Sequence, residues 1–254
     1  MKQLFSRFKS INRLEKARLK WLEQVQGKEG AGIEALPTEI NAISAVSWPE
    51  KSKNFAELEF LLLDFETTGL SPETDNILSI GYVELKGGTL DLNTSHETYI
   101  KDSSGINALT AVINQITPEM LKQGQSLDEA MSALFERMKG KVVVVHGLSV
   151  ERGFIDQYMQ DKFGISFPPT LWLDTLQIEK SMAVNMHNKR DGDYRLSSIR
   201  ERYGLPEYPC HGALIDAVAT GELFLVMMKK MFGTETPQLH QIYDAVHYEM
   251  TVSG

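Results

Sequence analysis

Hydrophobic and polar positions follow two different patterns along the chain, and the change comes near residue 58. In residues 1 to about 26, apolar residues recur among lysines and arginines at roughly helical spacing, which predicts an amphipathic helix. Residues 27–56 carry glycines and prolines spread through irregular sequence, which indicates a linker or a wrap-around segment. We therefore expect a basic helical arm and linker over residues 1–56 and a regular domain over residues 57–254.

The regular part contains short apolar runs and longer segments with helical spacing. The apolar runs predict strands over 58–63, 77–85, 90–100, 142–145 and 171–173, and Gly87-Gly88 fits a hairpin turn between the second and third. Helical spacing and capping residues predict helices that open at 117, 126, 149, 174, 196 and 212, and a last one after 237. Hairpin-linked strands followed by strands that alternate with helices indicate an α/β domain with a mixed sheet.

Composition excludes several classes of protein. With 254 residues, of which 42% are hydrophobic, the chain can bury a sizeable core. The single cysteine, Cys210, excludes a disulfide framework and any multi-cysteine metal site. No apolar run approaches the ~18–20 residues of a membrane span. The basic N-terminus has no apolar segment after it, so we expect a cytoplasmic protein with no membrane partner.

Charge is distributed unevenly. The whole chain has a net charge of −8, but residues 1–30 hold eight basic and three acidic residues, so the acidity lies in the remainder. The arm could be a basic helix for nucleic acid or a membrane surface, or it could pack its apolar face on the main domain or on a second subunit, which we favour. The acidic body argues against avid non-specific binding of duplex nucleic acid, yet it is compatible with a metal-dependent cleft.

Two acids at the end of the first strand are the sharpest local signal. Asp64 and Glu66 are two residues apart on a strand, so their side chains project from the same face. Their mutual repulsion is understandable if divalent cations lie between them, although a solvated strand end is the simpler alternative. The following Thr67-Thr68-Gly69 is a turn whose backbone can approach a ligand closely.

Two more segments carry candidate chemistry. His211 precedes a predicted helix and Asp216 lies in its early turns, so both side chains could reach one cleft. A neutral imidazole beside carboxylates is a candidate general base, whereas the alternative is a capping histidine with a helix-start aspartate. The strand over 142–145 ends at His146 and leads into a helix that carries Glu151, at a place where open α/β sheets bind ligands. A strand-to-helix turn with a solvated glutamate is the alternative there.

Together these three segments resemble the DEDDh 3′–5′ exonucleases, the DnaQ-like family that includes the proofreading exonuclease subunit of bacterial DNA polymerase III. The first motif, Asp-x-Glu-Thr-Thr-Gly, is complete from Asp64, and the last, His-x-x-x-x-Asp, ends at Asp216. The resemblance covers about residues 57–232 and implies an RNase H-like mixed sheet flanked by helices. In the middle motif, Glu151 replaces the family's aspartate and Gly147 replaces its asparagine, while Asp156 falls five positions late.

The resemblance also implies a set of roles in phosphodiester hydrolysis by two divalent metal ions. Mg²⁺ or Mn²⁺ would be bound by four carboxylates, since both are hard cations that prefer oxygen. Asp64 would bridge the ions, Glu66 and Asp216 would hold the ion that bears the attacking water, and Glu151 would act on the second ion. His211 would accept the proton of the water.

The resemblance extends to the substrate. The backbone around Thr67 and Thr68 would hold the terminal 3′ nucleotide, and Leu70 and Phe154 could wedge against its base or simply belong to the core. We therefore expect a 3′–5′ exonuclease that degrades single-stranded nucleic acid, with DNA favoured, to nucleoside 5′-monophosphates. Residues 1–56 could bind a second copy of the chain or a polymerase or repair partner.

Three alternatives stay open at the level of sequence. An exoribonuclease of the same family is one, because recognition of the 2′-hydroxyl depends on pocket geometry. A nucleic-acid-binding module that has lost catalysis is another, with Glu151 marking the altered site. The third is a structural or interaction protein whose working part is the basic N-terminal helix.

Overall fold

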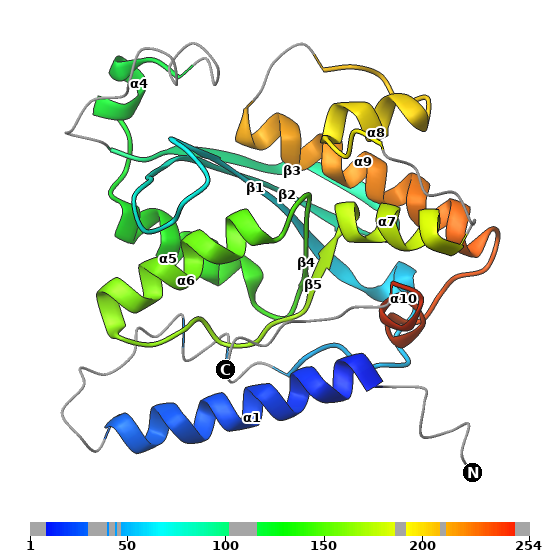
Figure 1. Cartoon of the computed structure of the whole chain (residues 1–254), viewed down its shortest axis with the longest axis horizontal. Helices are drawn as coiled ribbons and strands as arrows, with labels where there is room; N and C mark the ends of the chain where they lie inside the picture. Colours follow the sequence, from blue (N-terminus) through cyan, green and yellow to red (C-terminus); the bar gives the residue numbers. More distant parts are fainter. Residues whose placement is uncertain are drawn as a thin grey trace.

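One mixed sheet organises the computed structural model, which describes residues 9–29, 40, 44, 47–101, 116–185, 192–208 and 212–246. In this described part, five strands lie in the order β3-β2-β1-β4-β5 (Figure 1). Antiparallel pairing joins β1 to β2 and β2 to β3, whereas β1, β4 and β5 run parallel. The strands are β1 (Glu59–Thr67), β2 (Ile77–Lys86), β3 (Thr89–Tyr99), β4 (Val142–Val145) and β5 (Trp172–Asp174). The expected α/β fold with a mixed sheet is confirmed.

Helices follow the strands much as the sequence predicts. Ser126 accepts the backbone N–H of Glu129 at the start of α5, as its capping box indicates, and Gly87 and Gly88 form the hairpin turn with φ values of 62° and 74°. None of the described helices is long and apolar enough to cross a membrane. The helices are α1 (Lys9–Glu29), α4 (Pro118–Lys122), α5 (Leu127–Met138), α6 (Ser149–Phe163), α7 (Thr175–Asn185), α8 (Leu196–Arg202), α9 (Ala213–Phe232) and α10 (Leu239–Ala245), with a 3₁₀ helix η1 (Phe55–Glu57).

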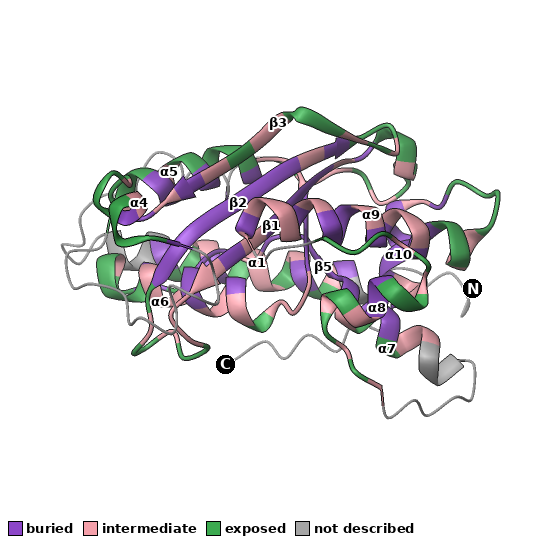
Figure 2. Ribbon diagram, turned by 90° about the horizontal axis from the view of Figure 1, so that it is seen from above, coloured by how far each residue is buried: buried purple, intermediate pink, exposed green. Residues whose placement is uncertain are grey.

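Side-chain alternation along β1 divides the core between the two faces of the sheet. Leu61 and Leu63 pack with apolar residues of α5 and α6, whereas Phe60 and Leu62 pack with residues of α7, α9 and α10. Figure 2 shows the resulting band of buried residues along β1 and β2, with helices on both sides. The two acids of β1, at positions 64 and 66, continue the row of Phe60 and Leu62 and so point to the side of α9.

Helix α1 packs on the rest of the same chain. Ile11 and Leu14 are buried in the core on the side of α9, while Trp21 and Val25 are buried on the side of α5 and α6. The indole N–H of Trp21 donates to the backbone oxygen of Ser166 at 2.9 Å. The apolar face of the arm is therefore covered by the main domain, which is one of the two arrangements expected for it.

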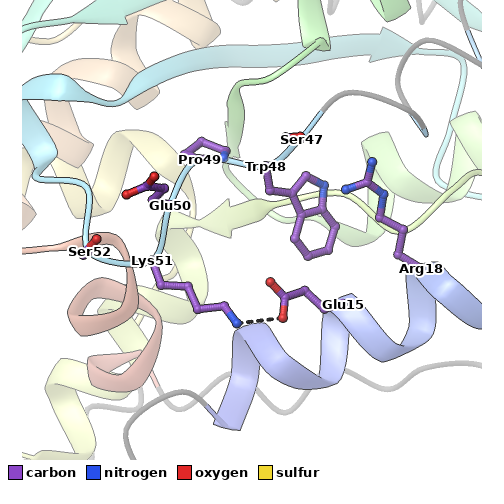
Figure 3. Close-up of a pocket in the computed structure, with 8 residues that line it drawn as sticks. All are labelled: Glu15, Arg18, Ser47, Trp48, Pro49, Glu50, Lys51 and Ser52. Atoms are coloured by element: carbon purple, nitrogen blue, oxygen red, sulfur yellow. Dashed lines mark hydrogen bonds and ion pairs between the residues drawn. The ribbon is translucent and has the colours of Figure 1, made fainter.

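A cavity of about 510 Å³ lies between α1 and residues 47–52 (Figure 3). At its rim, Lys51 Nζ forms an ion pair with Glu15 Oε2 at 2.7 Å, and the guanidinium of Arg18 lies 5.1 Å from the ring centre of Trp48. These contacts attach α1 to the segment that leads into β1. The acidic residues singled out in the sequence do not line this cavity.

Candidate active site

The carboxyl end of β1 presents two acids on a rigid strand. Asp64 and Glu66 lie on one face, and Phe65 between them turns into the opposite core. A change of register follows directly, between Glu66 and Thr67, so regular pairing with β2 is interrupted just after the second acid. The acids therefore stand where the chain leaves the sheet, beside the end of β4, which is the region where parallel strands of α/β folds place ligands.

Helix α9 brings a third carboxylate to this point. Asp216 lies in the first turn of α9, where its backbone N–H donates to the oxygen of Gly212 at 2.9 Å. Carboxylate oxygens of Asp64, Glu66 and Asp216 all lie within 4.8 Å of one another. Three close carboxylates form a donor set suited to hard divalent cations. The structure thus brings together three of the four acids that the motifs indicate.

A glycine in β2 allows α9 to approach so closely. Gly81 pairs with Asp64 across the sheet, and a Cβ atom at Gly81 would lie 2.1 Å from the backbone nitrogen of Leu214. No side chain fits into that distance, so the first turn of α9 rests directly on the β2 backbone. Asp216 is placed by this contact between helix and sheet.

Glu97 of β3 is a nearby acid that the sequence did not reveal as part of the site. It pairs with Gly81, in line with Asp64, and its charge raises the pKa of both Asp64 and Glu66. Burial raises the pKa of Glu97 itself, whereas the backbone N–H groups of Leu214 and Ala213 at the start of α9 lower it. Glu97 therefore faces the positive end of α9 from the sheet.

Glu151 lies in the first turn of α6 and is only 2% exposed. Burial raises its pKa to about 8, the charge of Asp174 acts in the same direction, and the backbone N–H of Phe65 opposes both. Among the described residues, Oε2 of Glu151 has no hydrogen-bond partner. A buried carboxylate oxygen without a partner is costly, and a bound cation would satisfy it. Glu151 is not one of the three acids whose oxygens lie within 4.8 Å, although its charge raises the pKa of Asp64.

Asp156, a second acid of this helix, is bound elsewhere. Its carboxylate accepts hydrogen bonds from Arg152 at 2.7 and 3.1 Å and from the backbone N–H of Phe167 at 2.9 Å. These contacts tie α6 to the segment before β5. They favour Glu151 over Asp156 as the acid available to a ligand.

Burial and mutual repulsion both act on the electrostatics of the acids. Burial, followed by the charges of Glu151, Asp216, Glu66 and Glu97, raises the pKa of Asp64 well above its usual range. Burial, with the charges of Asp216 and Glu97, raises the pKa of Glu66 to about 7. Divalent cations would turn this repulsion into attraction, so the residues present fit a metal site.

Of the two histidines singled out in the sequence, the structure describes one. His211, the expected general base, lies outside the described residues, as does Cys210. His146 is fixed at the end of β4, with Nδ1 2.8 Å from Thr175 Oγ1 and Nε2 2.9 Å from the backbone oxygen of Tyr194. Burial lowers the pKa of His146, so its neutral form is favoured.

The turn after Glu66 is held by its own hydrogen bonds. Thr67 Oγ1 donates to the oxygen of Gly69 at 2.6 Å, and Thr68 Oγ1 donates to Asp75 Oδ1 at 3.1 Å. The backbone N–H of Thr68 donates to the oxygen of Asn76, so this donor is already used within the loop. Leu70 at the tip is 78% exposed. A large apolar side chain is thus presented to solvent four residues after Glu66.

Phe154 has a different environment from Leu70. It is 4% exposed and packs in the core on the side of α5 and α6, together with Ile155 and Met159 of the same helix. In this structure its ring supports α6 against the sheet.

Comparisons with known proteins agree with this geometry. The Exonuclease family model, RNase_T, matches residues 61–224, which is more than half of the chain. DNA polymerase III of the PolC type from Thermotoga maritima is 31% identical over 197 residues, which cover 76% of this chain and 14% of the relative. The corresponding Bacillus cereus protein is 27% identical over 215 residues, again 14% of its length. The chain therefore spans about one seventh of the length of these relatives.

Solved structures show the same fold. The nuclease domain of 3′hExo, described as a DEDDh family member and bound to rAMP, superposes with a TM-score of 0.59 at 18% identity, covering 73% of this chain and 98% of that one. Exonuclease X in complex with 5′-overhanging duplex DNA gives a TM-score of 0.53 at 17% identity, covering 72% and 98%. The RNase H-like fold expected from the motifs is confirmed by these neighbours. With the family model matching from β1 into α9, this chain belongs to the Exonuclease family.

Proposed function

We propose that this protein is a metal-dependent 3′–5′ exonuclease that hydrolyses single-stranded nucleic acid, with DNA favoured, to nucleoside 5′-monophosphates. The observation that carries the proposal is the group of Asp64, Glu66 and Asp216, whose oxygens lie within 4.8 Å of one another and whose repulsion calls for cations. Its relatives of the PolC type are DNA polymerases, which favours DNA as the substrate.

We assign two divalent cations, Mg²⁺ or Mn²⁺, to the four acids. Asp64 would be held in common by the two cations, as the resemblance implies, and its oxygens lie within 4.8 Å of those of Glu66 and Asp216. Glu66 and Asp216 would hold one cation and Glu151 would act on the other, since Glu151 is not among the acids whose oxygens lie within 4.8 Å of one another. When bound, the cations would neutralise the phosphodiester and lower the pKa of the attacking water.

The side chains of the protein then supply positioning and proton transfer. We assign proton abstraction to His211, five residues before Asp216, because its neutral imidazole is the competent base near pH 7. Leu70 is assigned to the base of the terminal nucleotide, since it is apolar, exposed and only four residues after Glu66 in the chain. Thr67 and Thr68 shape the loop that presents Leu70, and Phe154 supports the helix that carries Glu151.

A divalent-metal assay with blocked substrates tests the proposal. Labelled single-stranded DNA and RNA of matched sequence, blocked at either the 3′ or the 5′ end, are incubated with Mg²⁺ or Mn²⁺. We expect release of nucleoside 5′-monophosphates only from free 3′ ends, with DNA cleaved faster than RNA. Asp64→Ala should be inactive. Cleavage that persists in excess EDTA, or that needs a free 5′ end, contradicts the proposal, and faster cleavage of RNA reassigns the substrate.

A further inference from the structure

Asp174, the last residue of β5, binds the turn that leads into α6. It is 3% exposed, and its two carboxylate oxygens accept three backbone N–H groups. Oδ1 accepts from Gly147 and from Leu176, both at 2.9 Å, and Oδ2 accepts from Leu148 at 3.1 Å. Two of the three donors belong to the turn between β4 and α6.

This turn has no capping side chain of its own. The N-cap position of α6 is Leu148, whose side chain accepts no hydrogen bond, and Gly147 before it adopts a φ of 98° that favours glycine. Val145 of β4 pairs with Asp174, so the carboxylate lies directly beside the point where the chain leaves the sheet. The path of the turn is therefore set by an acid from the neighbouring strand.

Glu151 follows Leu148 by three residues and lies in the first turn of α6. A shift of this turn moves Glu151 directly, because only one helical turn separates them. The charge of Asp174 also reaches Glu151, since it raises the pKa of Glu151. Both oxygens of Asp174 accept backbone N–H groups, so the carboxylate is oriented toward the turn.

We propose that Asp174 is a positioning residue, whose carboxylate fixes the β4–α6 turn and thereby holds Glu151 in place for a divalent cation. This inference rests on the proposed function, in which Glu151 is a metal-binding acid. Groups that orient metal ligands typically change metal affinity or activity by about 10–100-fold when they are replaced.

The test replaces Asp174 and a matched buried acid. Asp174→Asn keeps the size of the side chain but leaves an amide N–H₂ facing a backbone N–H. Glu179→Gln is the control, because Glu179 is also buried and accepts from Tyr203 at 2.7 Å and Arg202 at 3.2 Å, away from the acids. Mn²⁺ binding to the substrate-free protein is measured by electron paramagnetic resonance, together with kcat, KM and thermal unfolding.

We expect Asp174→Asn to weaken Mn²⁺ binding and lower kcat by about 10–100-fold, with little change in KM. Glu179→Gln should lower the unfolding temperature and leave Mn²⁺ binding within twofold (roughly the resolution of such a titration). The proposal is overturned if Mn²⁺ binding and kcat of Asp174→Asn stay at the parental level. It is also overturned if both quantities fall equally in Asp174→Asn and Glu179→Gln. If the parental protein itself fails to bind Mn²⁺, the proposed function fails with it.

A second variant covers the case in which Asp174→Asn does not fold. Asp174→Glu keeps the charge and both acceptor oxygens but moves them outward by one methylene group. We expect the same direction of change in Mn²⁺ binding and kcat, smaller than for the amide. Parental values of both in a folded Asp174→Glu protein overturn the proposal.

Discussion

Individual carboxyl groups make the stability of the cation-free protein depend on pH. The pKa of Glu66 is raised from 4.5 to about 7 and that of Glu151 to about 8, in both cases chiefly by burial. The folded state thus holds these protons more tightly than the unfolded state, so raising the pH destabilises the fold across this interval. We expect the unfolding temperature in EDTA to fall between pH 5 and pH 8.

Two controls accompany that measurement. Glu66→Gln removes one of the titrating groups, so its unfolding temperature should depend less steeply on pH than that of the parent. Excess Mg²⁺ should flatten or reverse the slope, because bound cations stabilise the charged carboxylates. An unfolding temperature that rises from pH 5 to pH 8 in EDTA contradicts the assigned burial of these acids.

The identity of the fourth acid is decided by comparing two residues of α6. Glu151 is buried with an unpartnered oxygen, whereas Asp156 is held by Arg152. We expect Glu151→Gln to lower kcat by at least about tenfold, and Asp156→Asn to keep nearly parental kcat while losing some stability. Glu151→Asp should shift the preference from Mn²⁺ towards Mg²⁺, because the shorter side chain positions its oxygen more strictly. The reverse pattern of activities would assign the role to Asp156.

At the scale of elements, the seating of α9 on β2 is the contact that defines the site. Gly81→Ala places a methyl group against the backbone of Ala213 and Leu214, so the helix must move. We expect a loss of about 1–3 kcal/mol in the free energy of unfolding, measured in denaturant, and weaker Mn²⁺ binding because Asp216 moves with the helix. Gly212→Ala is the matched control, since a Cβ there meets open space. Equal stability of the two variants would contradict this account of the seating.

Local signals predicted the elements well, because caps, turns and apolar runs act over a few residues. Thr117 and Ser126 cap helices as expected, and the hairpin at Gly87-Gly88 lies where it was predicted. The differences from the prediction lie at the ends of elements. Helix α1 continues through Gly27 to Glu29, past its expected end near residue 26. Tertiary packing of its apolar face stabilises the helix beyond what the local sequence indicates. The motif from Asp64 to Gly69 likewise predicted the acids of β1.

Long-range placement was less accessible to sequence. If β2 and β3 kept one regular register from the hairpin turn, Gly81 would lie opposite Thr94. An irregularity between Tyr82 and Glu84 shifts the register by three residues, so Gly81 lies opposite Glu97 instead. Asp174 stands where the sequence predicts the opening of a helix, but its backbone contacts depend on how β5 lies beside β4. Such residues are set by strand register and tertiary packing, and the apolar pattern alone does not encode either.

At the scale of the whole molecule, α1 stabilises both halves of the core. Trp21 is buried and donates a hydrogen bond to Ser166, so Trp21→Ala should lower the free energy of unfolding by about 3–5 kcal/mol. Leu19 on the same helix is 60% exposed, so Leu19→Ala should change the free energy of unfolding by no more than about 0.5 kcal/mol. Denaturant titration of both variants measures the difference. Similar small losses would show that α1 is dispensable to the fold.

The burial of α1 limits which side of this helix could contact a partner. Its apolar face is occupied by the sheet-packing helices and by α10, so a polymerase, a repair protein or a second copy that binds α1 would have to contact the side that faces solvent. That side carries lysines and arginines among its exposed residues, including Lys20. Contact there would be weakened by salt.

The contact between α1 and α10 has a consequence for biosynthesis. Ile11 and Leu14 share their core with Leu239 and Tyr243, which are synthesised more than 220 residues later. Until that last helix has been translated, the first one lacks part of its packing, and contacts so distant in sequence form slowly. A nascent chain stalled before residue 239 therefore leaves apolar surface of α1 open to chaperones and proteases.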